Sequence, residues 1–161
     1  RGRMELAATK KNGATVYVDY AHTPDAIEVA LKSLKPHILG NLIVVIGAGG
    51  ERDEGKRPLM GTAAEQNSDF VIITDDNPRN ENPSVIHQMI RNGIQNDNKV
   101  KIIADRAEAI LTAVNLLKVG DGLLIAGKGH ETKQVIGENN FPFDDFEQAS
   151  LSVASLDGVE Q

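Results

Sequence analysis

The sequence predicts an α/β fold built on an open, mostly parallel sheet with helices on both faces. Short runs rich in Val and Ile alternate along the chain with longer segments whose apolar residues recur at helical spacing. The short runs do not alternate between polar and apolar residues, which is typical of strands covered on both faces. Because β-α-β alternation favours parallel strands joined by helical crossovers, we expect a Rossmann-like arrangement.

The expected elements follow in order along the chain. Strands are predicted at residues 14–20, 42–47, 70–74, 99–103 and 122–126, and helices at residues 24–39, 56–67, 83–95 and 106–117. Two helix starts carry a capping residue followed by proline, Thr23-Pro24 and Asn82-Pro83. Residues 132–135 are expected to add a final edge strand and residues 146–156 a closing helix.

Composition excludes several classes of protein. The net charge is −6 and there is no long basic run, so we expect no nucleic-acid partner and no anionic membrane partner. The chain has no cysteine, which excludes a disulfide framework, a thiolate zinc site and a cysteine nucleophile. No stretch has the length of a membrane span, and no apolar signal region opens the chain. We expect a cytoplasmic protein.

The 161 residues suffice for one domain with its own core. The chain does not begin with Met, and its first residues read as a linker. We therefore expect residues 1–161 to be one domain of a longer enzyme.

Polar motifs follow four of the predicted strands. They are DYAHTPD at residues 19–25, GAGGERDEGKRP at 47–58, DDNPRNENP at 75–83 and GKGHE at 127–131. In open α/β sheets ligands bind outside the carboxyl ends of the strands. The four loops are therefore expected to meet at one edge of the sheet and to form a single site.

Two glycine-rich patterns in the second loop resemble nucleotide-binding loops but are incomplete. In residues 50–57 the Gly and Lys positions match a P-loop, but Arg57 stands where a Ser or Thr hydroxyl would hold magnesium. In residues 47–52, Arg52 replaces the last glycine of a dinucleotide fingerprint. We expect neither site. An autonomous phosphotransferase that uses the loop from Gly50 to Lys56 stays open as an alternative, as does a loop that only turns the chain.

The charges on these loops match a zwitterionic ligand. Arg52 and Arg79 carry planar guanidinium groups suited to carboxylates, whereas Asp76 and Glu131 can accept an ammonium group. Asn77 can donate or accept, and Gly127 allows close approach of the backbone. The alternative is that these groups form surface salt bridges, each worth about 0–1 kcal/mol. Their placement on adjacent loops favours an amino-acid pocket.

The four motifs resemble, in order and spacing, those of the C-terminal domain of the Mur (muramyl) ligase family. The preceding GRME at residues 2–5 is similar to the junction with that family's central ATP-binding domain, and the match thins after about residue 137. DNPR at residues 76–79 resembles the diaminopimelate-adding members, from which lysine-adding relatives differ. There are small departures, since Glu51 stands where the family usually has Asp and Lys133 at an often aromatic position.

The resemblance implies a domain of a three-domain ligase of peptidoglycan synthesis. Such an enzyme uses ATP and Mg²⁺, bound mainly by the central domain, to activate the dipeptide carboxylate of UDP-MurNAc-L-Ala-D-Glu, which the amine of meso-diaminopimelate attacks. The meso-diaminopimelate site would comprise Arg52, Asp76, Asn77, Arg79, Gly127 and Glu131. Arg79 would read the distal carboxylate that lysine lacks. A lysine-adding ligase of the same family and a non-catalytic interaction module also stay open.

The resemblance also implies a nucleotide-facing set, formed by Arg3, Asp19, Tyr20 and His22. Arg3 would be the catalytic residue, stabilising charge on the terminal phosphate. His22 could instead cap local backbone. His130 is expected to order its loop, whereas Lys56 and Lys128 could be phosphate contacts or solvated charges. No metal ligand is expected within this chain.

Overall fold

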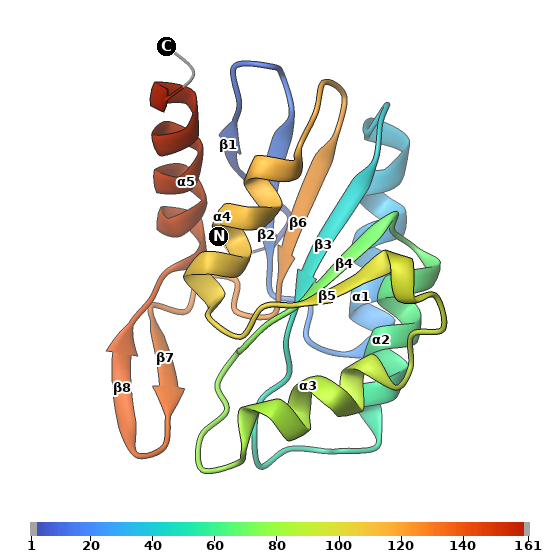
Figure 1. Ribbon diagram of the computed structural model, residues 1–161, viewed down its shortest axis with the longest axis vertical. Coiled ribbons are helices and arrows are strands. Elements are labelled where there is room, and N and C mark those ends of the chain that lie inside the picture. Colours follow the sequence, from blue (N-terminus) through green and yellow to red (C-terminus); the bar gives the residue numbers. More distant parts are fainter. Residues whose placement is uncertain (1–2, 160–161) are drawn as a thin grey trace.

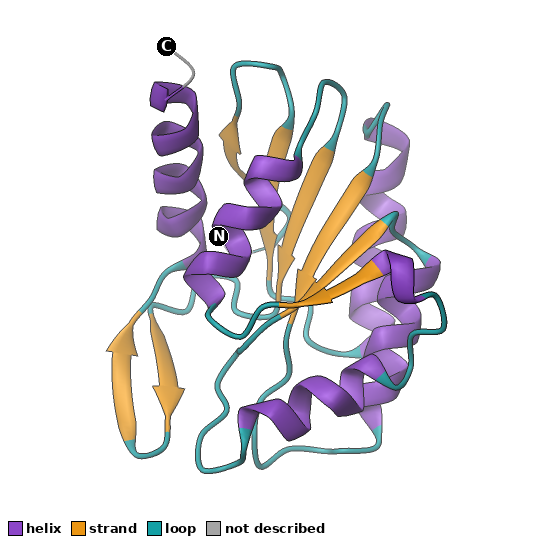
Figure 2. Cartoon of the chain, viewed as in Figure 1, coloured by secondary structure: helices purple, strands orange, loops and turns teal. Residues whose placement is uncertain are grey.

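The computed structural model describes residues 3–159, which form a twisted sheet between two layers of helices (Figures 1 and 2). The sheet has six strands in the order β1-β2-β6-β3-β4-β5. All pairs are parallel except β1 with β2. The strands are β1 (Glu5–Thr9), β2 (Thr15–Asp19), β3 (Leu42–Ile46), β4 (Phe70–Ile73), β5 (Val100–Ile102) and β6 (Gly122–Ala126). The predicted α/β fold is confirmed.

Helices cover both faces of the sheet. They are α1 (Pro24–Leu34), α2 (Lys56–Gln66), α3 (Pro83–Arg91), α4 (Arg106–Leu116) and α5 (Asp145–Val159). The first three pack on one face and the last two on the other. Successive residues of a central strand enter opposite cores, as Val44 and Val45 of β3 do. This explains why the strands read as continuous apolar runs. No helix within residues 3–159 is long and apolar enough to cross a membrane.

The helix starts use the capping residues that the sequence indicated. Thr23 Oγ1 accepts a hydrogen bond from Ala26 N at 3.2 Å, and Pro24 occupies the first turn of α1. Asn82 Oδ1 accepts from Ser84 N at 3.0 Å at the start of α3. Each cap satisfies a backbone N–H that has no partner inside the helix. The caps also fix where two of the four polar loops end.

The ends of two helices and the structure of the first residues differ from expectation. Helix α1 ends at Leu34 and a 3-10 turn follows, because Pro36 lacks an N–H and its ring disfavours a continuing α-helix. Helix α3 likewise ends at Arg91, and a turn containing Gly93 follows instead of helix to residue 95. Strand β1 was expected to be linker, yet it pairs antiparallel with β2.

A strand is present near residues 132–135, as expected, but its assignment to the edge of the main sheet was wrong. Strand β7 (Lys133–Ile136) does not join the main sheet but pairs with β8 (Asn139–Pro142) in a separate hairpin. The hairpin projects from the body of the molecule beside the loop after β4 (Figure 1). The turn at Gly137, with φ 62°, allows the chain to reverse there.

Candidate functional site

Two adjoining hollows lie at the carboxyl ends of the strands, where the polar loops were expected to meet. The first, here called the central cavity, has a volume of about 370 Å³. All six residues expected to bind the amino acid line it, together with Tyr20 and His22. The second, the α1 hollow, has a volume of about 500 Å³ and is lined by all four residues of the expected nucleotide set and by the apolar side of α1. Tyr20 and His22 border both.

The loop after β4 carries Asp76, Asn77 and Arg79 and is held from behind by β7. Arg79 N donates to Val135 O at 3.1 Å, and Gly137 N donates to Arg79 O at 2.5 Å. Arg79 has φ 54°, a left-handed conformation that a non-glycine residue adopts only where its surroundings enforce it. The hairpin contacts therefore set the direction in which the Arg79 side chain leaves the loop.

The guanidinium group of Arg79 is only partly used by the protein. Its Nη1 donates to Gly50 O at 3.0 Å and to Asn77 O at 3.3 Å. Within residues 3–159, its other nitrogen atoms have no hydrogen-bond partner. Arg52 is exposed on the facing loop and donates only to the neighbouring Glu51 O at 3.2 Å. Both guanidinium groups thus keep donors for a carboxylate.

The loop after β3 is fixed by a buried arginine that the sequence did not single out as a site residue. Arg57 is 1% exposed, donates to both carboxylate oxygens of Glu81 at 2.6 and 2.9 Å, and donates to Gly49 O at 3.0 Å. The hydrogen bonds from Arg57, helped by one from Glu51 N, lower the pKa of Glu81 to about 2. Gly50 packs directly against the Pro78 carbonyl, so no side chain fits at this position.

The same loop does not form a phosphate cradle. A P-loop directs free backbone N–H groups at the phosphates. Here Gly50 N donates to Asn77 O at 2.8 Å, Glu51 N to Glu81 Oε1 at 3.0 Å and Gly55 N to Asp53 Oδ1 at 3.0 Å. A phosphate would have to displace the protein's own carboxylates, so the geometry does not support an autonomous phosphotransferase.

The loop after β6 contributes Gly127 and Glu131 to the cavity. Gly127 has φ 117°, and a side chain there would come within 2.9 Å of Asp76 Oδ2. Lys128 is fully buried, and its ammonium group is hydrogen-bonded to protein atoms. Its interpretation as a solvated charge is therefore wrong, and a role as a phosphate contact is not supported. His130 is exposed and has no hydrogen bond to other residues in 3–159, which does not support its expected role in ordering the loop.

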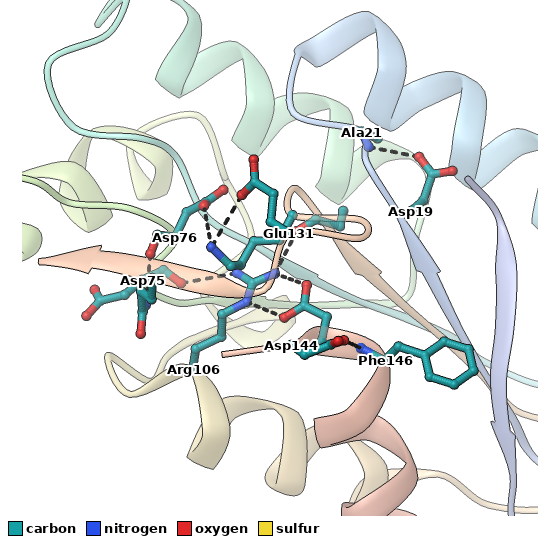
Figure 3. A network of polar contacts seen from close by, with 12 residues as sticks. Asp19, Ala21, Asp75, Asp76, Arg106, Glu131, Asp144 and Phe146 are labelled. Atoms are coloured by element: carbon teal, nitrogen blue, oxygen red, sulfur yellow. Dashed lines mark hydrogen bonds and ion pairs between the residues drawn. The ribbon is translucent and has the colours of Figure 1, made fainter. Parts of the chain in front are cut away.

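A buried ion pair joins two of these loops beneath the cavity. Arg106 and Asp145 are both 0% exposed and meet through two hydrogen bonds of 2.8 and 2.6 Å. The remaining donors of Arg106 reach Asp75 O and Ala126 O, each at 3.1 Å, at the ends of β4 and β6 (Figure 3). Burial acts to lower the pKa of Arg106, but the hydrogen bonds and charge of Asp145, together with the charges of Asp76 and Glu131, outweigh it and the pKa is raised. The guanidinium therefore stays charged.

Asp76 lies between the central cavity and two buried cations, Arg106 and Lys128. Burial raises the pKa of its carboxyl above the ordinary value, and the positive charges of Arg106 and Lys128 act against this rise. Figure 3 shows Asp76 and Glu131 turned toward the same region, above Arg106. The balance between burial and the two cations thus sets the charge that Asp76 presents to a ligand.

The residues around the α1 hollow make mainly local contacts. Asp19 accepts from Met4 N at 2.6 Å and from Ala21 N at 2.8 Å, and so ties the segment before β1 to the turn after β2. The exposed His22 ring lies 3.0 Å from Tyr20 O through Nδ1, which matches a role as a local cap. Arg3 is exposed. Gly2, the first residue of the GRME motif, lies outside the described residues.

The sequence predicted no metal ligand in this chain. Among residues 3–159, no group of three or more His, Asp or Glu side chains could hold a metal ion. Lys56 is exposed at the rim of the central cavity, a position that fits a phosphate contact as well as a solvated charge.

Several known proteins are similar to this chain in sequence and in fold. The chain is 49% identical, over 98% of its length, to the UDP-N-acetylmuramoyl-L-alanyl-D-glutamate–2,6-diaminopimelate ligase of Agrobacterium fabrum. It is 51% identical over 94% of its length to the ligase of the same name from Coxiella burnetii. A solved structure of a ligase with this name superposes with a TM-score of 0.91 at 41% identity, covering 97% of this chain and 32% of that one.

The chain spans about a third of the length of these relatives, 32% and 31% of the two curated proteins. The family model described as the glutamate ligase domain of Mur ligases matches residues 2–129. This stretch includes all ten residues of the expected sites except Glu131. On this match and these identities, the chain belongs to the family of Mur ligase glutamate ligase domains.

Proposed function

We propose that this chain is the amino-acid-binding, C-terminal domain of a three-domain cytoplasmic ligase that adds meso-diaminopimelate to UDP-MurNAc-L-Ala-D-Glu in peptidoglycan synthesis. One observation carries the proposal: six residues from three loops, chosen from the sequence, line a single cavity. The relatives that are 49% and 51% identical over the aligned residues have names that give the same amino acid and the same acceptor.

The cavity offers groups that complement both ends of the amino acid. At neutral pH meso-diaminopimelate carries two carboxylates and two ammonium groups. Arg79 and Arg52 keep free donors for carboxylates, and Asp76 and Glu131 present carboxylate oxygens for ammonium groups. L-Lysine lacks the distal carboxylate, so it would leave the free donors of the Arg79 guanidinium desolvated and unpaired. That loss is worth about 1–3 kcal/mol.

The α1 hollow presents groups that suit a nucleotide. It combines the exposed guanidinium of Arg3, the aromatic ring of Tyr20 and apolar atoms of α1 such as those of Val29. ATP, when bound, would supply the activation of the acceptor carboxylate, and Arg3 would stabilise negative charge on the phosphates. Asp19 would act indirectly by holding the segment that carries Arg3. We assign no Mg²⁺ ligand to residues 3–159.

The contribution of this domain to catalysis is positioning. Binding the amino acid in the central cavity would fix the attacking amine relative to a carboxylate presented at the mouth of the cavity. Orientation of two reactants can supply a large share of a rate enhancement. We therefore expect the chain alone to bind the amino acid and to catalyse no ligation.

The test is a titration of the isotopically labelled chain with meso-diaminopimelate and, separately, L-lysine, followed by backbone amide NMR shifts up to millimolar ligand. We expect shifts at residues 76–79 and 127–131 with meso-diaminopimelate only. The variant Arg79→Asn should lose them, because asparagine tolerates the φ of 54° while removing the guanidinium group. Arg91→Asn, at the end of α3 away from the cavity, is the matched control.

Any of three results would contradict the proposal. Equal shifts with L-lysine would remove the assignment to meso-diaminopimelate and favour a lysine-adding ligase of the same family. No shifts with either amino acid would contradict binding at the cavity, and ATP-dependent ligation by the chain alone would contradict the division of labour among domains.

A further inference from the structure

Lys128 is a buried cation directly behind the residues that face the central cavity. Its side chain is 0% exposed, although lysine is rarely buried to this degree without a partner. The ammonium group donates to Asn77 Oδ1 at 3.1 Å, Lys133 O at 2.7 Å and Glu131 Oε1 at 3.4 Å. Asp76 Oδ1 lies 3.8 Å away. One nitrogen atom therefore contacts three of the six residues assigned to the amino acid.

These contacts join two loops that come from different parts of the chain. Asn77 and Asp76 follow β4, whereas Glu131 and Lys133 follow β6. Asn77 Oδ1 accepts a second hydrogen bond, from Val135 N at 2.9 Å, so the orientation of its amide is fixed. With the oxygen turned inward to Lys128 and Val135, the amide's remaining donor group is the part available to a ligand. Lys128 and the Val135 N–H thus together set which end of Asn77 can bind.

The same ammonium group also sets the charge of the cavity wall. Asp76 and Glu131 place two carboxylates near one another, and Lys128 lies in ion-pair range of both. Removing one partner from such a buried cluster leaves an uncompensated charge. Without Lys128 the wall would be more negative by one charge, or Asp76 would take up a proton.

We propose that Lys128 is a specificity-determining positioning residue of the amino-acid site, which helps to orient Asn77 and Glu131 and balances the wall charge in favour of a net-neutral diamino diacid over a cationic diamino monoacid. The proposal rests on the proposed function and deepens it. meso-Diaminopimelate has no net charge at neutral pH, whereas L-lysine carries one positive charge. A wall made more negative repels the distal carboxylate and attracts the extra cation.

The experiment compares Lys128→Met with Lys128→Arg and the wild-type chain. Methionine keeps the unbranched stem and removes the charge, whereas arginine restores a charge. We expect Lys128→Met to weaken binding of meso-diaminopimelate about tenfold or more and to lower its preference over L-lysine. Lys128→Arg should recover part of the preference. The side-chain amide signals of Asn77 should move in Lys128→Met even without ligand.

The matched control is Lys10→Met. Lys10 is also a buried lysine, 5% exposed, and donates to the carbonyls of Val114 and Leu117 at the far end of α4. Its replacement removes a comparable buried cation without touching the cavity, and should leave both amino-acid affinities within about twofold of wild type. If Lys128→Met does not fold, Lys128→Gln, which keeps a donor without the charge, takes its place.

Three results would overturn the proposal. The first is an unchanged ratio of the two affinities in the Lys128 variant that lacks the charge. The second is an equal loss in Lys10→Met, which would show an effect of stability alone. The third is an unmoved Asn77 side-chain signal. The third readout needs no ligand, so it tests this proposal by itself. Failure of the proposed function would appear instead as the absence of amide shifts when either amino acid is added to the wild-type chain.

Discussion

The central cavity and the α1 hollow lie side by side but are built differently. Behind the central cavity stand three buried cations with carboxylate partners, which are Arg57, Arg106 and Lys128. Their hydrogen bonds cross between the loops after β3, β4 and β6. Around the α1 hollow, Arg3 and His22 are exposed, and the side chains of Asp19 and His22 hydrogen-bond only to backbone groups of Met4, Ala21 and Tyr20 among the described residues.

Within residues 3–159, the folded chain fixes more of the binding geometry of the central cavity than of the α1 hollow. A side chain whose partners are buried has few alternative positions, so the central cavity is preorganised and a ligand has little ordering to do there. The exposed side chains of the α1 hollow keep their rotamer freedom and lose it only when a ligand binds. Substitutions behind the central cavity should therefore lower the free energy of unfolding strongly, and substitutions beside the α1 hollow only weakly.

The largest effect is expected from Asp145→Asn. It leaves Arg106 charged, buried and without its counter-ion, which costs about 3–5 kcal/mol of the free energy of unfolding. Urea denaturation followed by circular dichroism measures this loss, with the exposed Glu147→Gln on the same helix as the control. A loss no larger than that of the control would show that the pair does not support the cavity.

The next effect is expected from Gly127→Ala. The positive φ disfavours alanine, and the added Cβ meets the Asp76 carboxylate, for a cost of about 1–3 kcal/mol. Gly13→Ala, in the turn between β1 and β2, also has a positive φ, 92°, with open space around it, so it should lose stability without a contact at Asp76. We expect only Gly127→Ala to weaken binding of meso-diaminopimelate in the amide titration. Equal weakening in both variants would contradict the role of this contact.

A pH-dependent effect is expected at the pair of Arg57 and Glu81. The pKa of Glu81 in the folded chain, about 2, lies below its ordinary value of 4.5. A depressed folded-state pKa stabilises the fold above pH 4.5, and this contribution is lost as the pH falls toward 2. The stability difference between wild type and Glu81→Gln should shrink over that window. Unfolding curves at several pH values measure it, with Glu138→Gln as the exposed control; a constant difference would argue against the pair.

The smallest effect on stability is expected from His22→Ala in the α1 hollow. The ring is exposed, and its polar contact is a local one to Tyr20 O, so the loss should stay within about 0.5 kcal/mol. Thermal denaturation measures the change. A drop as large as that of Gly127→Ala would contradict the contrast between the two hollows, because it would show that the second is also braced by its side chains.

The sequence was sufficient for five of the six strands of the main sheet and for the six cavity residues assigned to the amino acid. Apolar runs such as residues 42–46 indicate strands buried on both faces, and the polar loops then fall at one edge. Strand β1 was missed because ELAAT is half-exposed and forms through backbone pairing with β2. The hairpin of β7 and β8 was misplaced because local pattern does not show which strand is the partner.

The sequence alone could not show that the buried cations brace the cavity. Arg57, Arg106 and Lys128 read as ordinary charges of a helix start or a loop, because the partners that bury them are distant in sequence. Glu81 is 24 residues from Arg57, and Asp145 is 39 residues from Arg106. Lys128 differs in that Glu131 is near, but its burial depends on Asn77, 51 residues away. Only the tertiary structure brings these groups together.

The most direct test of a preorganised amino-acid site is a crystal structure of the chain grown with millimolar meso-diaminopimelate. We expect a carboxylate of the ligand within hydrogen-bond distance of the Arg79 guanidinium, and an ammonium group beside Glu131 or Asp76. The backbone of residues 76–79 and 127–131 should move by less than about 1 Å, as in other preorganised sites. A ligand bound in the α1 hollow, or loops that rebuild around it, would contradict this account.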